Sequence, residues 1–140
     1  MSTRIALLSD IHGNAVAAKA VRKAIKRERP DHVIVAGDLV LNGPDPAGAI
    51  AEVRELEQAG ALVVSGNTDL AVADADYTAA FPWLPEVPDS YKYAAEWARD
   101  ALSDEELAWL RRLGPQLRHH LVVAALGDEA DVLAVWLLGH

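Results

Sequence analysis

Three apolar runs in the first half of the chain each stop at polar residues and glycine. Residues 5–8 lead into Ser-Asp-Ile-His-Gly-Asn, residues 33–36 into Gly-Asp, and residues 62–64 into Ser-Gly-Asn-Thr-Asp. A continuous apolar run of this kind is typical of a strand buried on both faces of a parallel sheet. Open α/β sheets bind their ligands just beyond the carboxyl ends of such strands. The pattern therefore predicts three parallel strands whose polar ends meet at one edge of one sheet.

Amphipathic stretches separate these runs and predict helices between the strands. The first helix is expected from Asn14 to about Arg29, where Pro30 follows. The second is expected to begin at Pro46, with Asp45 as its N-cap. The residues predicted to form the buried face of the first helix are Val16, Ala20, Val21, Ala24 and Ile25. The order of elements is thus β-α-β-α-β, which indicates an α/β fold.

A proline-rich segment follows the third run. Residues 74–90 contain three prolines among aromatic residues, and they are predicted to form a loop in which Trp83 could line a substrate cleft. Two helices are predicted after it, over residues 91–101 and 104–113. The second of these starts at a capping box, because a serine is followed three residues later by glutamate.

Composition narrows the class of protein. The chain has 140 residues, of which 51% are hydrophobic, so it can form one domain with its own core. It has no cysteine, and no apolar stretch is long enough to cross a bilayer, which fits the expectation of a cytoplasmic protein without a membrane partner. A formal net charge of −8 opposes binding to nucleic acid.

The polar strand ends carry a family resemblance. Taken together, in this order and spacing, the three motifs resemble those of the calcineurin-like metallophosphoesterases, specifically their small bacterial phosphoesterases and phosphodiesterases. The motifs are Asp10-Ile-His12-Gly-Asn, Gly37-Asp38-Leu-Val and Gly66-Asn67-Thr68-Asp69. The resemblance extends to Gly43-Pro44-Asp45-Pro46, and the helices after residue 90 look like the helical insert of those proteins. It implies a metallophosphoesterase-like layered fold.

The resemblance also implies a site with two divalent metal ions. Asp10 and His12 would bind the first ion, Asp38 would bridge both ions, and Asn67 would bind the second. Oxygen and imidazole ligands suit Mn, Fe, Zn or Ni. Asp69 is expected to hold the loop and not to contact metal.

Two departures from the family pattern change this expectation. Where the family has a histidine after the Gly-Asn pair, this chain has Thr68, whose hydroxyl has no pKa suited to general acid catalysis. The later His-Gly and Gly-His-x-His motifs of the family are not intact, and His140 is the candidate for the first histidine of the second motif and a further metal ligand. The sequence is therefore interpreted as a single calcineurin-like domain over residues 1–140, truncated or degenerate at its C-terminus, with the second sheet of the fold largely missing.

The expected function is metal-dependent hydrolysis of small phosphate mono- or diesters. The resemblance implies attack by a metal-bound hydroxide, with Asp38, Asn67 and Thr68 as catalytic residues. The first alternative is a catalytically inactive remnant that only binds metal or phosphate. A second alternative, a nucleotide-binding module of the Rossmann type, ranks last because no Gly-x-Gly-x-x-Gly follows the first strand.

The end of the chain predicts self-association. Residues 121–123 and 132–138 are apolar, and without the partner strands of a second sheet they must pack on the first sheet, pair with another chain or aggregate. A homo-oligomer formed through these segments is the expected outcome.

Overall fold

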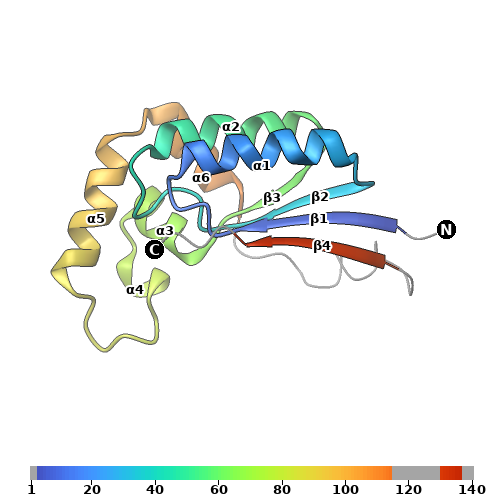
Figure 1. Cartoon of the computed structure of the whole chain (residues 1–140). Coiled ribbons are helices and arrows are strands. Elements are labelled where there is room, and N and C mark those ends of the chain that lie inside the picture. Colours follow the sequence, from blue (N-terminus) through green and yellow to red (C-terminus); the bar gives the residue numbers. More distant parts are fainter. Residues whose placement is uncertain (1–2, 115–129, 137–140) are drawn as a thin grey trace.

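The computed structural model describes residues 3–114 and the backbone of residues 130–136 (Figure 1). Strands and helices alternate through β3, as the sequence predicts, and a group of helices then precedes the last described strand. In chain order the elements are β1 (Thr3–Ser9), α1 (Ala15–Glu28), β2 (His32–Ala36), α2 (Pro46–Gln58), β3 (Leu62–Val64), α3 (Asn67–Asp74), α4 (Tyr77–Ala80), α5 (Asp89–Asp100), α6 (Asp104–Arg112) and β4 (Ala130–Trp136).

The described strands form one parallel sheet in the order β3-β2-β1-β4. In β1, Leu7 is in register with Ile34 of β2 on one side and with Ala134 of β4 on the other. All pairings are parallel, so the carboxyl ends of β1, β2 and β3 lie at the same edge of the sheet. The predicted meeting of the three polar strand ends is confirmed.

Helices α1 and α2 lie side by side across one face of the sheet (Figure 1). Ile50 and Val53 of α2 are fully buried in the same core as Leu8 and Val35 of the sheet. Arg22 of α1 forms an ion pair with Glu52 of α2, which raises the pKa of the Arg22 guanidinium through the hydrogen bond to that carboxylate. Burial of the apolar side chains between the two helices and the sheet is the main stabilising contribution to this layer.

The predicted buried face of α1 is partly wrong. Ala18 and Ile25 are its buried residues, whereas Val16 is 82% exposed and Ala20 is also exposed. With 3.6 residues per turn, positions two residues before and after Ala18 point to the opposite side of the helix. The buried stripe therefore follows Ala18, and Val16 and Ala20 face solvent.

Helices α3 to α6 gather at the carboxyl edge of the sheet (Figure 1). The prediction of a loop over residues 74–90 is wrong in two places. Asp76 caps the single turn of α4 by accepting a hydrogen bond from the Ala79 N–H, and α5 begins at Asp89. The predicted capping box at Ser103 and the helix that follows it are confirmed. No helix among the described residues is long and apolar enough to cross a membrane.

Strand β4 pairs with β1 along its whole length. This part of the apolar C-terminal segment is therefore a strand of the first sheet. Residues 121–123 and His140 lie outside the described residues.

Self-association through the apolar residues 121–123 and 132–138 stays a prediction, and the described part of that segment is the strand β4. In the described part of the chain this strand ends the sheet, and an unpaired strand edge is a template for pairing with a second chain. We expect sedimentation velocity to give species heavier than the 15.0 kDa chain. A monodisperse monomer that binds no apolar dye would contradict this prediction.

Candidate metal centre

The ends of β1 and β2 are joined by backbone hydrogen bonds. The Asp10 N–H donates to the Gly37 carbonyl at 3.2 Å, and the His12 N–H donates to the Asp38 carbonyl at 2.9 Å. These bonds continue the pairing of the two strands into the loops that follow them. The side chains of the two loops are thereby held beside each other.

Asp10, His12 and Asp38 form a cluster that could hold a metal ion. One ligand atom from each residue lies within 4.8 Å of the other two, and all three residues are half-buried. The Nε2 atom of His12 is 3.6 Å from Oδ1 of Asp10. Carboxylate oxygens and imidazole nitrogen suit first-row divalent ions, and the separations are small enough for side-chain movements to close the three onto one ion.

The orientation of His12 is set by a residue that the sequence pattern did not reveal. Its Nδ1 lies 2.8 Å from the backbone carbonyl oxygen of Leu41. A carbonyl can only accept, so Nδ1 must be the donor, and the lone pair of the neutral ring is on Nε2. The nitrogen nearer to Asp10 is therefore the one free to bind metal. Ser9 was also missed, and its hydroxyl donates to Oδ2 of Asp10.

Thr68 contacts Asp38. Its hydroxyl donates to Oδ1 of Asp38 at 2.6 Å, and its backbone N–H lies 3.2 Å from the same oxygen. Oδ2 of Asp38 accepts no hydrogen bond from any residue that the structure describes, so it is the oxygen available to a metal ion. The hydroxyl of Thr68 thus orients a candidate ligand.

Asn67 is the first residue of α3 and lies in the same cleft. Its Nδ2 donates to the Ala80 carbonyl at 3.0 Å, which leaves the amide oxygen as the atom able to bind a cation. The cleft has a volume of about 280 Å³. Its lining combines candidate ligands with apolar and aromatic residues, namely His12, Asp38, Leu41, Asn42, Asn67, Thr68, Phe81, Trp83 and Tyr91.

Comparison with known proteins gives the family. The model of the calcineurin-like phosphoesterase superfamily domain matches residues 3–140, which is nearly the whole chain. The chain belongs to the calcineurin-like phosphoesterase superfamily. No curated protein matches it significantly.

Two solved structures are similar to this superfamily member. A metallophosphoesterase from Sphaerobacter thermophilus is 29% identical with a TM-score of 0.55, over 79% of this chain and 40% of that one. The predicted metallophosphoesterase-like α/β fold is thereby confirmed. A "putative diadenosine tetraphosphatase" is 22% identical with a TM-score of 0.40, over 69% of this chain and 47% of that one, a likeness too weak to carry an argument. This chain therefore spans less than half the length of either relative.

The backbone is strained at the three clustered residues of this superfamily member. Asp10, His12 and Asp38 have φ angles of 58°, 47° and 57°, in the left-handed region that residues with a Cβ rarely adopt. Asp and His adopt this region more readily than most residues with a Cβ, so the cost lies toward the lower end of about 1–3 kcal/mol per residue; such conformations cluster at functional sites. The neighbouring Asn42, which also lines the cleft, has φ 73°. The other described non-glycine residues with positive φ, Arg29 and Ala75, end α1 and α3.

Glycines let the strand-end loops approach each other closely. A Cβ on Gly66 would overlap Oδ1 of Asp38, and a Cβ on Gly37 would overlap the backbone of Gly66. On the other side of the site, a Cβ on Gly43 would overlap the carbonyl oxygen of His12. In the Gly-Asp, Gly-Asn and Gly-Pro motifs, a larger residue in place of the glycine would overlap a neighbouring loop.

Asp69 connects the loops after β2 and β3, as expected for a residue that holds the loop. Its side chain is 1% exposed, and its two oxygens accept from the N–H groups of Leu39 and Gly66, each at 2.8 Å. Burial raises the pKa of Asp69 to about 6, although the hydrogen bonds from Gly66 and Leu39 oppose that rise. Asp38 and Asn67 follow the two strands that this carboxylate joins.

Asp69→Asn should destabilise the fold. An amide offers one acceptor oxygen, so one of the two N–H groups would face an NH₂ group and stay unsatisfied, which costs about 1–3 kcal/mol. Chemical denaturation of the full chain measures the change in the free energy of unfolding. The control is Asp74→Asn, which removes only a half-exposed ion pair with Arg111 and should cost less than about 1 kcal/mol. Equal losses in the two variants would contradict the role given to Asp69.

Gly66→Ala should weaken metal binding, because the added Cβ would overlap Oδ1 of Asp38 and lie 2.5 Å from the backbone nitrogen of that residue; circular dichroism checks that the variant folds. The added methyl group displaces Oδ1 of Asp38, and a shifted ligand lowers metal affinity about 10–100-fold. Titration calorimetry with Mn²⁺ tests this expectation. Gly60→Ala is the control, because no atom lies within 4 Å of the added Cβ and the backbone strain that its φ of 101° imposes falls after α2, outside the candidate centre. Unchanged Mn²⁺ affinity in Gly66→Ala would show that Asp38 is not a ligand.

Proposed function

We propose that this protein hydrolyses small phosphate mono- or diesters with the help of divalent metal ions. The observation that carries the proposal is the cluster of Asp10, His12 and Asp38 at one sheet edge, in a chain of the calcineurin-like phosphoesterase superfamily. Asn67 and Thr68 belong to the same cleft. The donor set fits a site for Mn, Fe, Zn or Ni.

Hydrogen bonds determine which atom of each candidate ligand could bind a metal ion. His12 offers Nε2 because Leu41 fixes its tautomer, and Asp38 offers Oδ2 because Thr68 occupies Oδ1. A negatively charged carboxylate can bind two cations, so Asp38 would keep the bridging role that the resemblance implies, with Asp10 and His12 as ligands of one ion and Asn67 as a ligand of the other. His140 stays a candidate further ligand outside the described residues.

In this proposal the metal ions supply positive charge for the phosphate. The described residues that line the cleft include no lysine or arginine. Two divalent cations, when bound, would hold the phosphate oxygens and supply the hydroxide that attacks phosphorus. The protein's own contribution is to position these ions and the ester.

Thr68 limits the leaving groups that the site can use. Its hydroxyl donates to Asp38 and has no pKa suited to protonating a leaving oxygen. General acid catalysis contributes about 10²–10⁴-fold, a factor that Thr68 cannot supply to esters with poor leaving groups. Aryl esters, whose leaving groups need no proton, are the preferred substrates of such a site.

The test is hydrolysis of p-nitrophenyl phosphate and bis-p-nitrophenyl phosphate with added Mn²⁺. We expect turnover that depends on Mn²⁺ and is abolished in Asp38→Asn, since an amide cannot bridge cations as a carboxylate does. The matched control is Asp31→Asn. Asp31 is exposed, accepts from the Arg4 N–H and precedes β2, at the opposite end of that strand from the candidate centre.

Two results would overturn the proposal. Turnover that survives in Asp38→Asn would place the activity elsewhere. Bound Mn²⁺ without turnover of either ester would favour the alternative of an inactive metal-binding member of the superfamily. Calorimetric titration with Mn²⁺ in parallel separates loss of metal from loss of chemistry.

A further inference from the structure

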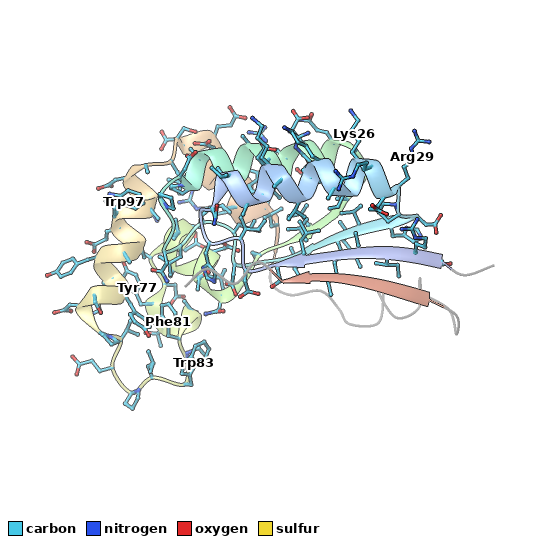
Figure 2. All side chains as sticks on the ribbon, viewed as in Figure 1. Lys26, Arg29, Tyr77, Phe81, Trp83 and Trp97 are labelled. Carbon is cyan, nitrogen blue, oxygen red and sulfur yellow. The ribbon has the colours of Figure 1, made fainter. Side chains whose placement is uncertain are left out.

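Three aromatic side chains form one wall of the cleft that holds the candidate ligands. Phe81, Trp83 and Tyr91, here called the aromatic wall, line the same cavity of about 280 Å³ as His12 and Asp38. Phe81 and Trp83 come from the segment after α4, as Figure 2 shows, and Tyr91 comes from the first turn of α5. A polar side and an aromatic side therefore face one cavity.

The rings of the aromatic wall are in contact through Phe81, its buried member. Phe81 is 4% exposed and contacts both other rings edge to face, with centroids 5.9 Å from Trp83 and 5.3 Å from Tyr91. Edge-to-face contacts are the preferred geometry of aromatic pairs. Trp83 is nonetheless 64% exposed and Tyr91 46% exposed. Phe81 thus supports two rings whose remaining surface is open to a ligand.

The position of the aromatic wall is tied to the candidate ligand Asn67. The Asn67 side chain donates to the carbonyl of Ala80, the residue directly before Phe81. On the other side of Trp83, the Leu84 N–H donates to the Phe81 carbonyl at 3.0 Å and closes a turn. Trp83 therefore lies inside a hydrogen-bonded turn that is anchored to the metal cleft.

We propose that the aromatic wall binds a planar aromatic group of the phosphoester substrate, an aryl or nucleobase ring, through contact with Trp83. The inference rests on the proposed function, because the phosphate must lie among the candidate ligands for its substituent to reach the wall. The cavity, at about 280 Å³, is just below the usual range of about 300–1,000 Å³ for ligand pockets, so it suits a small ligand with one ring and a phosphate. Stacking of one ring on an aromatic side chain changes affinity about 5- to 100-fold.

The experiment compares two ligands that cannot be hydrolysed, phenylphosphonate and methylphosphonate, by calorimetry on the Mn²⁺-loaded full chain. Methylphosphonate reports phosphonate binding alone, and the ratio of the two affinities reports the contribution of the ring. We expect phenylphosphonate to bind wild type about 10-fold more tightly than methylphosphonate. Trp83→Ala should abolish this preference without changing the affinity for methylphosphonate.

Two further variants complete the design. Trp83→Phe keeps a ring and should retain most of the preference. Trp97→Ala removes a tryptophan that is also about half exposed but lies on α5 and does not line the cleft, so it should change neither affinity.

The outcomes separate the two proposals. Equal affinity of wild type for both ligands, or a preference unchanged in Trp83→Ala, overturns the role of the aromatic wall and leaves the proposed function intact. Failure of wild type to bind methylphosphonate overturns the proposed function, and the inference falls with it.

Discussion

The geometry of the candidate centre depends on one buried carboxylate. Asp69 accepts hydrogen bonds from the loop after β2 and from the loop after β3, and burial makes its loss costly. The sheet brings strand ends only to the same edge. The distance between the Asp38 and Asn67 loops, a matter of a few ångströms, is set by Asp69 and by the glycines that let these loops touch. The candidate centre therefore depends on a residue that need not contact metal.

Strain at the centre is supported by the layer behind it. Three left-handed residues together cost several kcal/mol by the usual estimate of about 1–3 kcal/mol each. Helices α1 and α2, packed on the sheet, bury the apolar side chains that offset this cost. Backbone bonds such as that from the Gly13 N–H to the Leu39 carbonyl then leave the loops no relaxed alternative. The loops also contribute to the core, because Ile11, Leu39 and Val40 are almost completely buried in it.

The sequence predicted what depends on local pattern, and it missed what depends on contacts between distant loops. Apolar runs with polar ends gave the parallel strands and the meeting of Asp10, His12 and Asp38. The sequence could not predict that the Leu41 carbonyl orients His12, because every residue has a backbone carbonyl. The buried face of α1 was partly misjudged at Val16 because its alanine-rich sequence allows several apolar stripes. Helix α4 was not predicted, because it is a single turn that depends on the cap at Asp76.

The roles proposed for Thr68 and Trp83 favour the same class of substrate for independent reasons. Thr68 orients Asp38 and cannot protonate a leaving oxygen, which favours esters of acidic alcohols such as phenols. Trp83 exposes an indole beside the same cleft, which favours a flat ring as the group next to the phosphate. Aryl groups satisfy both conditions, because the ring that stacks also stabilises the departing negative charge. A nucleobase satisfies only the second, because Thr68 offers no suitable proton to the leaving oxygen of its sugar-linked ester.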